Sequence, residues 1–401
     1  MLRIALFSYE YPPDTHDGGI GTYTHQAARM LTAMGHYVEV FCGSLTRNGK
    51  FDEENVIVNR VLCPNGHHDF MEAVLSTFEQ RHYEVSFQVI ESPEFKADAL
   101  RVAERFPSLA LVVKLHTPSY LIRQLTHQHS PWFVKPYNQF RNINQGKRLA
   151  RVDFREKSIT EKADLVISPS ESLATIVATK WKIKKIETLA YPFSPPKQLL
   201  SQSFCEHNAK QIAFVGRLEI RKGILPLLEA LPNLLGTNRN ILFHFIGKES
   251  QSPIPKVSMK RYIELKLYRY RIQIRFHGQQ PQERVFKILE NVSICVFPSL
   301  WENYPNVCLE AMTAGKAVVA SKNGGMSEMI QDGINGLLIN PYNSREISDA
   351  LLFLLQNPKR SAFFGTQARK RIIGIHNWET MGKLQVQYYQ ETIDRKTRKV
   401  R

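Results

Sequence analysis

Residues 292–321 read VSICVFPSLWENYPNVCLEAMTAGKAVVAS. The apolar run Val292–Phe297 predicts a buried strand, a helix is expected to open near Pro305, and Ala317–Ala320 predicts a second strand. A strand, a helix and a strand in this order are typical of a βαβ unit, in which the two strands are parallel. This stretch therefore predicts an α/β fold.

The same alternation extends through both halves of the chain, and each half begins with a buried run. In the first half we expect strands at Leu2–Phe7, Tyr37–Cys42, Val85–Ile90, Leu109–Leu115 and Leu165–Ser168. In the second half we expect further strands at Gln211–Val215, Ile241–Ile246, Gln273–Phe276 and Gly336–Ile339. Helical patterns lie between these runs, so the sequence predicts two Rossmann-like domains with parallel sheets facing across a cleft.

The segment 191–196, YPFSPP, separates the two halves. Its prolines suit a stiff, extended linker, and we place the domain boundary there. Residues 1–192 are expected to form the first domain, with 120–160 as an insertion in it. Residues 193–376 are expected to form the second domain.

Composition restricts the class of protein. The chain has 401 residues, 43% hydrophobic and 22% charged, which is typical of a globular protein. No apolar run approaches the roughly 20 residues of a membrane-spanning helix, and the start of the chain lacks the pattern of a signal peptide. Five cysteines without a CxxC pair argue against a disulfide scaffold or a zinc site, so we expect a reducing, cytoplasmic location.

The net charge of +16 indicates anionic partners, and most of it lies after residue 195. Residues 123–157 carry eight cations among aromatic side chains, and residues 395–401 carry five. Both segments predict peripheral contact with an anionic membrane face, although a basic lid over an anionic acceptor or a solvated tail fits equally. The basic and tyrosine-rich stretch 256–275 is compatible with single-strand nucleic acid, but an amphipathic helix explains it as well.

The first chemical motif, DGGIGT at residues 17–22, precedes an expected helix at Thr22–Met34. Glycines let the backbone approach a ligand closely, and the amides at a helix start can bind a phosphate. A glycine-rich turn without a ligand is an equally good explanation. Thr24 stands where a dinucleotide fingerprint would need its third glycine.

The second motif, GRLEIRKG at residues 216–223, follows an expected strand. It places Arg217 and Lys222 at the carboxyl edge of the second sheet, where open α/β folds bind ligands. A guanidinium, which can donate two parallel hydrogen bonds, and a lysine ammonium together suit a diphosphate. Two solvated cations on a surface loop would give the same pattern.

The third motif, residues 298–311, follows the expected strand Val292–Phe297. Glu302 is expected in its loop, and Glu310 is expected on the helix that follows.

These motifs together resemble the family four glycosyltransferases, which are retaining, nucleotide-sugar-dependent enzymes of the GT-B fold. The resemblance covers nearly the whole chain. The matching pieces are GGIGTYTHQAARMLTAMGH (18–36), ADLVISPS (163–170), GRLEIRKG (216–223), the E-x7-E of Glu302 and Glu310, NGGMSE (323–328) and DGINGLL (332–338). It also implies that residues 377–395 form a final helix crossing back to the first domain, followed by a basic tail at 396–401.

The resemblance implies how the donor nucleotide is held. Arg217 and Lys222 would neutralise its diphosphate, and Glu310 would bind the ribose hydroxyls. Gly19 and Gly21 would bring the first domain's backbone against the diphosphate.

The resemblance also implies the sugar site. Glu302 would contact the transferred sugar beside the backbone of Asn306 and Val307, which also belong to the expected diphosphate site. His116 matches a histidine that lines the sugar site, and a polar residue at a strand end is its plainer explanation. Glu302 and His116 are thus the expected catalytic residues.

We expect no metal ion and no other cofactor. None of the ten aspartates forms an Asp-x-Asp pair, so cations and helix N-termini are expected to stabilise the leaving diphosphate. The pairs His67-His68 and His127-x-His129 are expected to be solvated loop residues.

The leading interpretation is a metal-independent, retaining hexosyltransferase. It would move a sugar from a nucleotide diphosphate sugar to a hydroxyl of a carbohydrate or lipid-linked acceptor, in the cytoplasm or at the inner membrane face. The alternative is a nucleic-acid-binding or anionic-membrane-binding protein without transferase activity, and nucleic acid is disfavoured because no recognition motif is present. The donor, the acceptor, and the choice between front-face and double-displacement mechanisms stay open. Residues 191–194 depart from the Asn-Gly-x-Asp turn of many family members. The roles that the family assigns to residues around the hinge are therefore not transferred to this chain.

Overall fold

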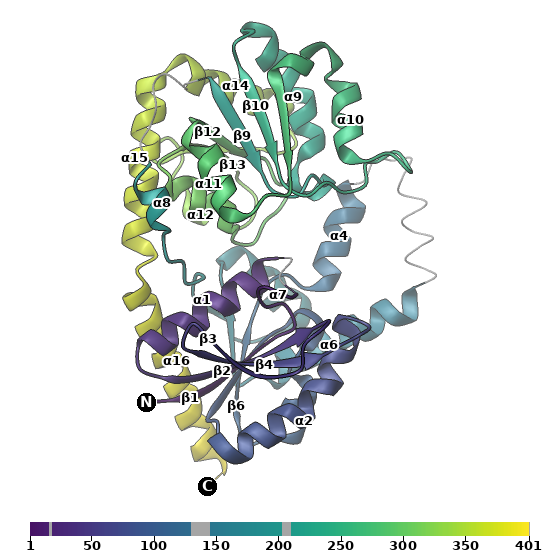
Figure 1. The fold of residues 1–401 in the computed structure, drawn as a ribbon, viewed down its shortest axis with the longest axis vertical. Helices are drawn as coiled ribbons and strands as arrows, with labels where there is room; N and C mark the ends of the chain where they lie inside the picture. The colour runs from purple at the N-terminus through teal and green to yellow at the C-terminus, as the bar shows by residue number, and fades with distance from the viewer. Residues whose placement is uncertain (16–17, 130–144, 203–209, 401) are drawn as a thin grey trace. The chain divides into compact units, whose positions relative to one another are not determined.

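The computed structural model describes residues 1–15, 18–129, 145–202 and 210–400 (Figure 1). The chain forms two compact units. The first comprises residues 1–122, 145–194 and 376–401, and the second comprises 123–144 and 195–375. Residues 123–129 thus group with the second unit, whereas we expected the whole insertion 120–160 in the first domain. Residues 130–144 lie outside the described part.

The first unit contains an eight-stranded sheet of order β3-β4-β2-β1-β5-β6-β7-β8. All neighbouring strands are parallel except β3 and β4. The strands are β1 (Arg3–Ser8), β2 (Tyr37–Ser44), β3 (Gly49–Glu53), β4 (Val56–Leu62), β5 (Val89–Pro93), β6 (Ala110–Lys114), β7 (Leu165–Ser168) and β8 (Glu187–Thr188).

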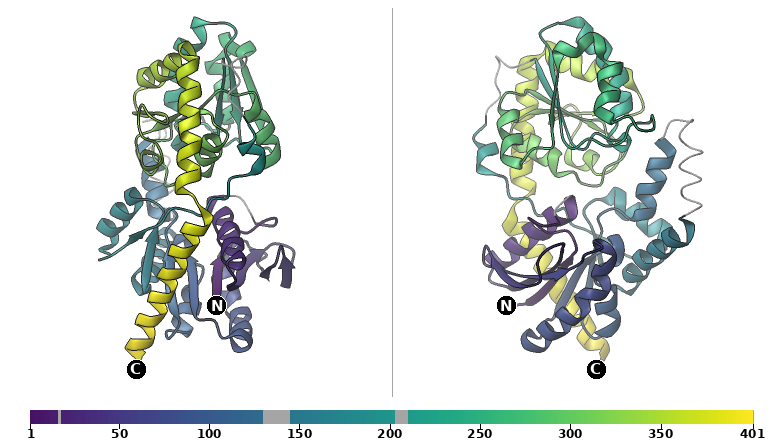
Figure 2. Two further views of the ribbon diagram at one scale, coloured as in Figure 1. Left: turned by 90° about the vertical axis from the view of Figure 1, so that its left-hand side faces the viewer. Right: turned by 45° about the vertical axis from the view of Figure 1, so that its right-hand side comes forward.

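The helices of this part of the chain are α1 (Gly19–Ala33), α2 (His67–Val85), α3 (Leu100–Arg105), α4 (Ser119–His129), α6 (Gly146–Lys162), α7 (Glu171–Trp181) and α16 (Trp378–Val400), with a short 3₁₀ turn η1 (Phe95–Ala97). Most of these helices cover the sheet, but α4 does not belong to the first unit alone, since its residues 123–129 group with the second unit. The last helix, α16, packs on β6 and α1 and runs along the first unit (Figure 2). It is continuous to Val400, so residues 396–400 are helical rather than a separate tail, and Lys396 Nζ lies 2.8 Å from Asp164.

The second unit contains a six-stranded, fully parallel sheet of order β11-β10-β9-β12-β13-β14. The strands are β9 (Gln211–Val215), β10 (Leu242–Ile246), β11 (Ile274–Gly278), β12 (Ile294–Phe297), β13 (Ala317–Ser321) and β14 (Leu337–Ile339). The helices are α8 (Lys197–Leu200), α9 (Ile224–Thr237), α10 (Met259–Lys266), α11 (Gln282–Glu290), α12 (Asn306–Thr313), α13 (Met326–Met329), α14 (Ser344–Gln356) and α15 (Pro358–Ile375), with 3₁₀ turns η3 (Ile220–Lys222) and η4 (Tyr268–Gln273).

The core of the second unit follows from the sequence pattern. The central strands are buried at nearly every position, as in a parallel sheet covered on both faces, and α9 is apolar over most of its surface, where it packs in the core with α14. Two Rossmann-like units with parallel sheets confirm the predicted α/β fold.

Some expected elements differ from those observed. Val85 ends α2, and β5 begins only at Val89, because the left-handed Ser86 closes the helix first. The strands β3 and β4 were not expected. They form a hairpin through Glu54 and Asn55, both with positive φ, at the edge of the sheet.

Two composition-based expectations can be compared with the structure. Cys42, Cys63, Cys295 and Cys308 are buried free thiols, and Cys205 lies outside the described residues. Across the described ranges, no helix combines the length and apolar character that crossing a membrane requires.

Candidate functional site

The order of the second sheet reverses beside β9. From β9 the chain proceeds to β10 on one side, and it later returns to β12 on the other side. Loops that follow the two strands at such a switch point diverge and leave room for a ligand at the carboxyl edge of the sheet. The loops after β9 and β12 carry the motifs at 216–223 and 298–305.

Gly223 lets these two loops meet. It has φ +75°, and a Cβ placed on it would lie 1.8 Å from the carbonyl oxygen of Pro298. Two residues from this contact on each loop, the Leu300 amide donates to the Arg221 carbonyl over 2.9 Å. Because any side chain at Gly223 would separate the loops, this glycine sets the position of the charged residues on both.

Glu302 lies at the centre of a cluster of charges. One of its carboxylate oxygens is 2.7 Å from an Arg221 guanidinium nitrogen and 2.6 Å from Lys222 Nζ. Arg221 also binds Glu219 over 2.9 Å. Burial alone would raise the pKa of Glu302, but the charges of Arg221 and Lys222 outweigh burial and lower it. Glu302 is therefore a carboxylate held in one orientation by two cations.

The backbone of Glu302 is fixed by the NGGM segment. The Gly325 amide donates to the Glu302 carbonyl over 2.9 Å. Gly324 has φ +79°, and a Cβ there would lie 2.0 Å from the same carbonyl oxygen. Only glycine allows this approach, which explains the glycine at position 324.

Arg217 lies outside this cluster. Its side chain is 51% exposed, and its nearest carboxylate, Glu219, is 3.9 Å away. Arg221 takes the buried position beside Lys222, and our sequence analysis gave it no role. Its place directly before Lys222 in the motif was the available signal.

The E-x7-E spacing places Glu310 on α12. Asn306 and Val307 are the first two residues of this helix, and their amides have no acceptor within a helical ladder. Glu310 is 8% exposed and accepts a 2.7 Å hydrogen bond from Gln282 at the start of α11. Burial raises the pKa of Glu310 to about 7. No sequence signal had pointed to Gln282.

In the first unit, α1 begins at Gly19, three residues before the expected start. Gly19 and Gly21 therefore lie in the first helical turn rather than in the preceding loop. The amides of this turn form the helix N-terminus, which carries partial positive charge. The anion site predicted here thus belongs to the helix end itself.

His116 follows β6 and is buried beneath aromatic rings. Its Nδ1 lies 2.7 Å from the Tyr191 hydroxyl, and its amide donates to Glu94 over 2.8 Å. The rings of Tyr23 and Tyr191 lie 5.2 and 5.3 Å from its ring. Burial and the charge of Lys114 lower the pKa of His116 to about 3, so its imidazole is neutral at physiological pH.

A second buried network lies under His116. Glu91 accepts hydrogen bonds from the Tyr23 and Tyr389 hydroxyls, over 2.7 and 2.6 Å, and from the Gln385 amide over 3.2 Å. These donors come from α1 and α16. The carboxylate of Glu91 therefore joins the last helix to the layer that supports His116.

The histidine pair 67–68 is not in a loop, since it opens α2, and His67 Nε2 lies 2.5 Å from Asp98. The described part of the chain contains no group of three or more histidine, cysteine or acidic side chains arranged for a metal ion. His127 is on α4, and the side chain of His129 is not described.

Two family models match the chain. The model for glycosyl transferases group 1 matches residues 198–371, and the model for Glycosyltransferase Family 4 matches residues 17–190. The chain belongs to the group 1 glycosyltransferases. It is a nucleotide-sugar glycosyltransferase of the GT-B fold, as the motifs predicted.

Two curated relatives match this glycosyltransferase over most of their length. Glycogen synthase of Mycobacterium tuberculosis is 23% identical over 97% of this chain and 94% of its own. D-inositol 3-phosphate glycosyltransferase of Corynebacterium urealyticum is 29% identical over 97% of this chain and 95% of its own.

Two solved structures share the fold of the glycosyltransferase. Sucrose-phosphate synthase from Thermosynechococcus elongatus has a TM-score of 0.75 at 20% identity, covering 98% of this chain and 99% of that one. Anabaena Alr3699/HepE in complex with UDP has a TM-score of 0.66 at 15% identity, covering 98% and 100%.

Proposed function

We propose that this glycosyltransferase transfers a hexosyl group from a nucleoside diphosphate sugar to an acceptor hydroxyl, with retention of configuration and without a metal ion. The observation that carries the proposal is the largely buried cluster of Glu302, Arg221 and Lys222 at the switch point of the second sheet, with Glu310 on the helix that follows the Glu302 loop. Cations, helix amides and a carboxylate are the groups that a nucleoside diphosphate needs.

Lys222 is the proposed main contact of the diphosphate. Its ammonium binds Glu302, and burial lowers its pKa. A diphosphate would give this ammonium two further anionic partners, while Arg221 keeps Glu302 ionised. The exposed side chain of Arg217 would form a further ion pair with the diphosphate. The amides of Asn306 and Val307, at the N-terminus of α12, would donate hydrogen bonds to it. These groups would stabilise the charge that develops on the leaving diphosphate.

Glu302 and His116 are the proposed residues of the reaction itself. Glu302 would bind hydroxyls of the transferred sugar, because its orientation is fixed by two cations. His116 would offer a neutral imidazole to a sugar hydroxyl, since its low pKa excludes a charged form at pH 7. The start of α1, with Gly19 and Gly21, is the proposed anion contact of the first unit.

The proposed acceptor is a carbohydrate or a lipid-linked hydroxyl, and the proposed location is the cytoplasm or the inner face of a membrane. Relatives named for glycogen synthesis and for transfer to D-inositol 3-phosphate support a polyhydroxylated acceptor. Family membership favours these over nucleic acid as a partner.

The test is turnover with a panel of UDP-, GDP- and ADP-sugars and simple acceptors, with and without EDTA. We expect one donor to be used, the product anomer observed by NMR to match the donor anomer, and EDTA to leave the rate unchanged. An inverted product would refute retention, and a rate abolished by EDTA and restored by Mg²⁺ or Mn²⁺ would refute metal independence.

Donor affinity should depend on pH through Glu310. Ribose hydroxyls donate to an ionised carboxylate, and burial raises the pKa of Glu310 to about 7. Affinity should therefore rise as pH increases through 7 and fall as pH decreases, by about tenfold between pH 8 and pH 6. Calorimetric titration with a nucleotide sugar measures this, because its phosphate diesters stay charged over that range.

Glu310→Gln is the matched control for this pH dependence. It keeps the size of the side chain and a carbonyl acceptor, and it removes the titration. The variant should bind the donor more weakly, with an affinity that is flat from pH 6 to pH 8. A wild-type affinity that is equally flat would show that Glu310 does not bind the ribose.

A further inference from the structure

The segment 256–275 of the second unit gathers cations with almost no neutralising acid. Its single acidic residue, Glu264, lies 3.4 Å from Arg261. Within the described ranges, the other cations form no ion pair. All seven cations are exposed: Lys256, Lys260, Arg261, Lys266, Arg269, Arg271 and Arg275.

Large apolar side chains are exposed among these cations. Leu265, Tyr268 and Ile272 are 55%, 63% and 66% exposed. Ile263 and Leu267 already fill the core beneath them. The exposed apolar groups are therefore not required by the packing of the unit.

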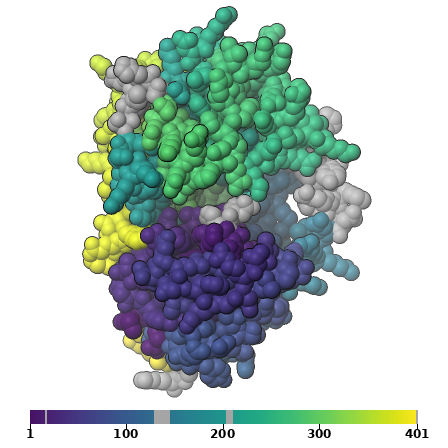
Figure 3. All heavy atoms as spheres, in the orientation of Figure 1, coloured from purple at the N-terminus to yellow at the C-terminus, as the bar shows by residue number. Residues whose placement is uncertain are grey.

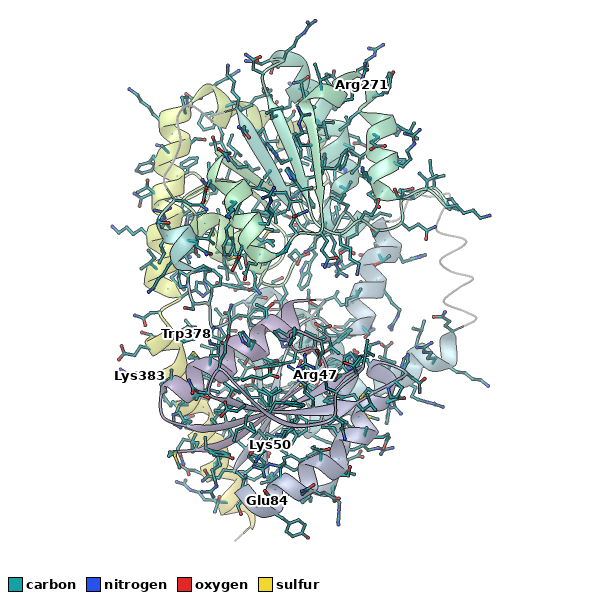
Figure 4. The ribbon with its side chains drawn as sticks, in the orientation of Figure 1. Arg47, Lys50, Glu84, Arg271, Trp378 and Lys383 are labelled. Carbon is teal, nitrogen blue, oxygen red and sulfur yellow. The ribbon has the colours of Figure 1, made fainter. Side chains whose placement is uncertain are left out.

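Leu265 lies near the C-terminal end of α10, and Tyr268 and Ile272 lie in the turn η4. In a 3₁₀ turn, residues three apart share a side, so Tyr268 and Arg271 lie together, with the guanidinium 4.8 Å from the ring centroid. Figure 4 shows Arg271 projecting outward from the second unit, and α10 lies at the surface of that unit in Figure 3. The segment is thus an apolar ridge bordered by cations.

The part of the segment that exposes the apolar side chains, residues 265–275, lies at the opposite edge of the sheet from the donor site, whereas residues 256–260 follow the loop at the carboxyl end of β10. The turn η4 leads directly into the amino end of β11, whereas the motifs at 216–223 and 298–305 follow the carboxyl ends of β9 and β12. Because the strands are parallel, these are opposite edges. A partner bound at residues 265–275 would leave the donor site uncovered.

We propose that the segment 256–275 docks the second unit on an anionic lipid bilayer. Its cations match the charge of anionic headgroups, and each contributes about a fivefold gain in binding. Leu265, Tyr268 and Ile272 match the boundary between headgroups and acyl chains. The aliphatic pair favours lipid over nucleic acid, because single-strand binders use aromatic stacking and phosphate contacts, which need no exposed leucine or isoleucine.

The helix α6 is the matched rival surface. It exposes Lys147, Arg148 and Arg151, but it exposes a single large apolar side chain, Phe154, at 70%. Lys157 on the same helix is partnered by Glu161. The geometry therefore favours the segment 256–275, which exposes three apolar groups.

The experiment is flotation of the full chain with vesicles of phosphatidylcholine alone or with a quarter phosphatidylserine. We expect binding only to the anionic vesicles, weakened by salt. Lys266→Gln, Arg269→Gln and Arg271→Gln together should lower the partition coefficient about a hundredfold. Leu265→Ser with Ile272→Ser should lower it at least tenfold while keeping every charge. Lys147→Gln, Arg148→Gln and Arg151→Gln on α6 are the charge-matched control and should change it by less than fivefold.

Thermal unfolding and turnover on a small soluble acceptor should match the wild type in all three variants, since none of the changed residues belongs to the donor site. The proposal is overturned if the α6 variant alone loses binding, or if the apolar variant binds anionic vesicles like the wild type. It is also overturned if the protein binds a single-stranded oligonucleotide but not the vesicles.

Discussion

Lys222→Met should lower kcat by about 10²–10³-fold with any donor the enzyme uses, the range found when one group that stabilises developing negative charge is removed. Its ammonium is buried and lies 2.6 Å from Glu302. The methionine keeps the length of the side chain and removes the charge. The diphosphate would then depart without its closest cation. Steady-state kinetics with a nucleotide sugar measures the effect.

Two further variants make this result specific. Lys222→Arg should recover a large part of kcat because it restores the charge. Arg217→Ala should cost less than Lys222→Met, since Arg217 is half exposed and outside the buried cluster. Thermal unfolding should show that Lys222→Met is folded, because Arg221 still pairs with Glu302. Equal kcat values for Lys222→Met and the wild type would refute the assigned role.

Glu91→Ala should destabilise the first unit by about 3–6 kcal/mol. Glu91 is 3% exposed and accepts hydrogen bonds from Tyr23, Tyr389 and Gln385. Its removal leaves the two buried tyrosine hydroxyls without their acceptor, at about 1–3 kcal/mol each, and opens a cavity, whereas the Gln385 amide keeps its bonds to both hydroxyls. Urea unfolding followed by circular dichroism should show a first transition at clearly lower urea.

Glu91→Gln and Glu104→Ala are the controls for this prediction. The glutamine keeps one carbonyl acceptor and should cost less than the alanine. Glu104 pairs with Arg101 at the surface, and its loss should cost less than about 1 kcal/mol. If Glu91→Ala unfolds at the same urea concentration as Glu104→Ala, the network around α16 does not stabilise the first unit.

Much of the fold could be predicted from local pattern. The strands β7 and β9 have the expected bounds, because each is a short buried run that a charged residue precedes and a proline or a glycine follows. The strand β3 could not be predicted, since an edge strand of sequence GKFDE buries little and carries no apolar alternation. The start of α1 was placed too late, because glycine has a poor helix propensity that the structure overrides at Gly19 and Gly21.

The candidate site was only partly accessible to sequence reasoning. Glu302, Lys222 and Glu310 lie in motifs whose spacing indicates a βα edge, and the structure places all three at the switch point of the second sheet. Arg221 lies beside Glu302 and Arg217 does not, because of how the chain turns at η3. The residues next to Arg217 and Arg221 in the sequence do not predict this difference. The contact between Tyr191 and His116 joins residues 75 positions apart, and no local pattern encodes it.

The central claim is that the carboxyl edge of β9 and β12 holds a nucleoside diphosphate through Lys222 and Glu310. A crystal structure of the protein with its preferred nucleotide sugar or nucleoside diphosphate tests this most directly. We expect phosphate oxygens within hydrogen-bond distance of Lys222 Nζ and of the Asn306 and Val307 amides, with the ribose hydroxyls on Glu310. An ordered nucleotide at another place, with Lys222 still bound only to Glu302, would contradict the claim.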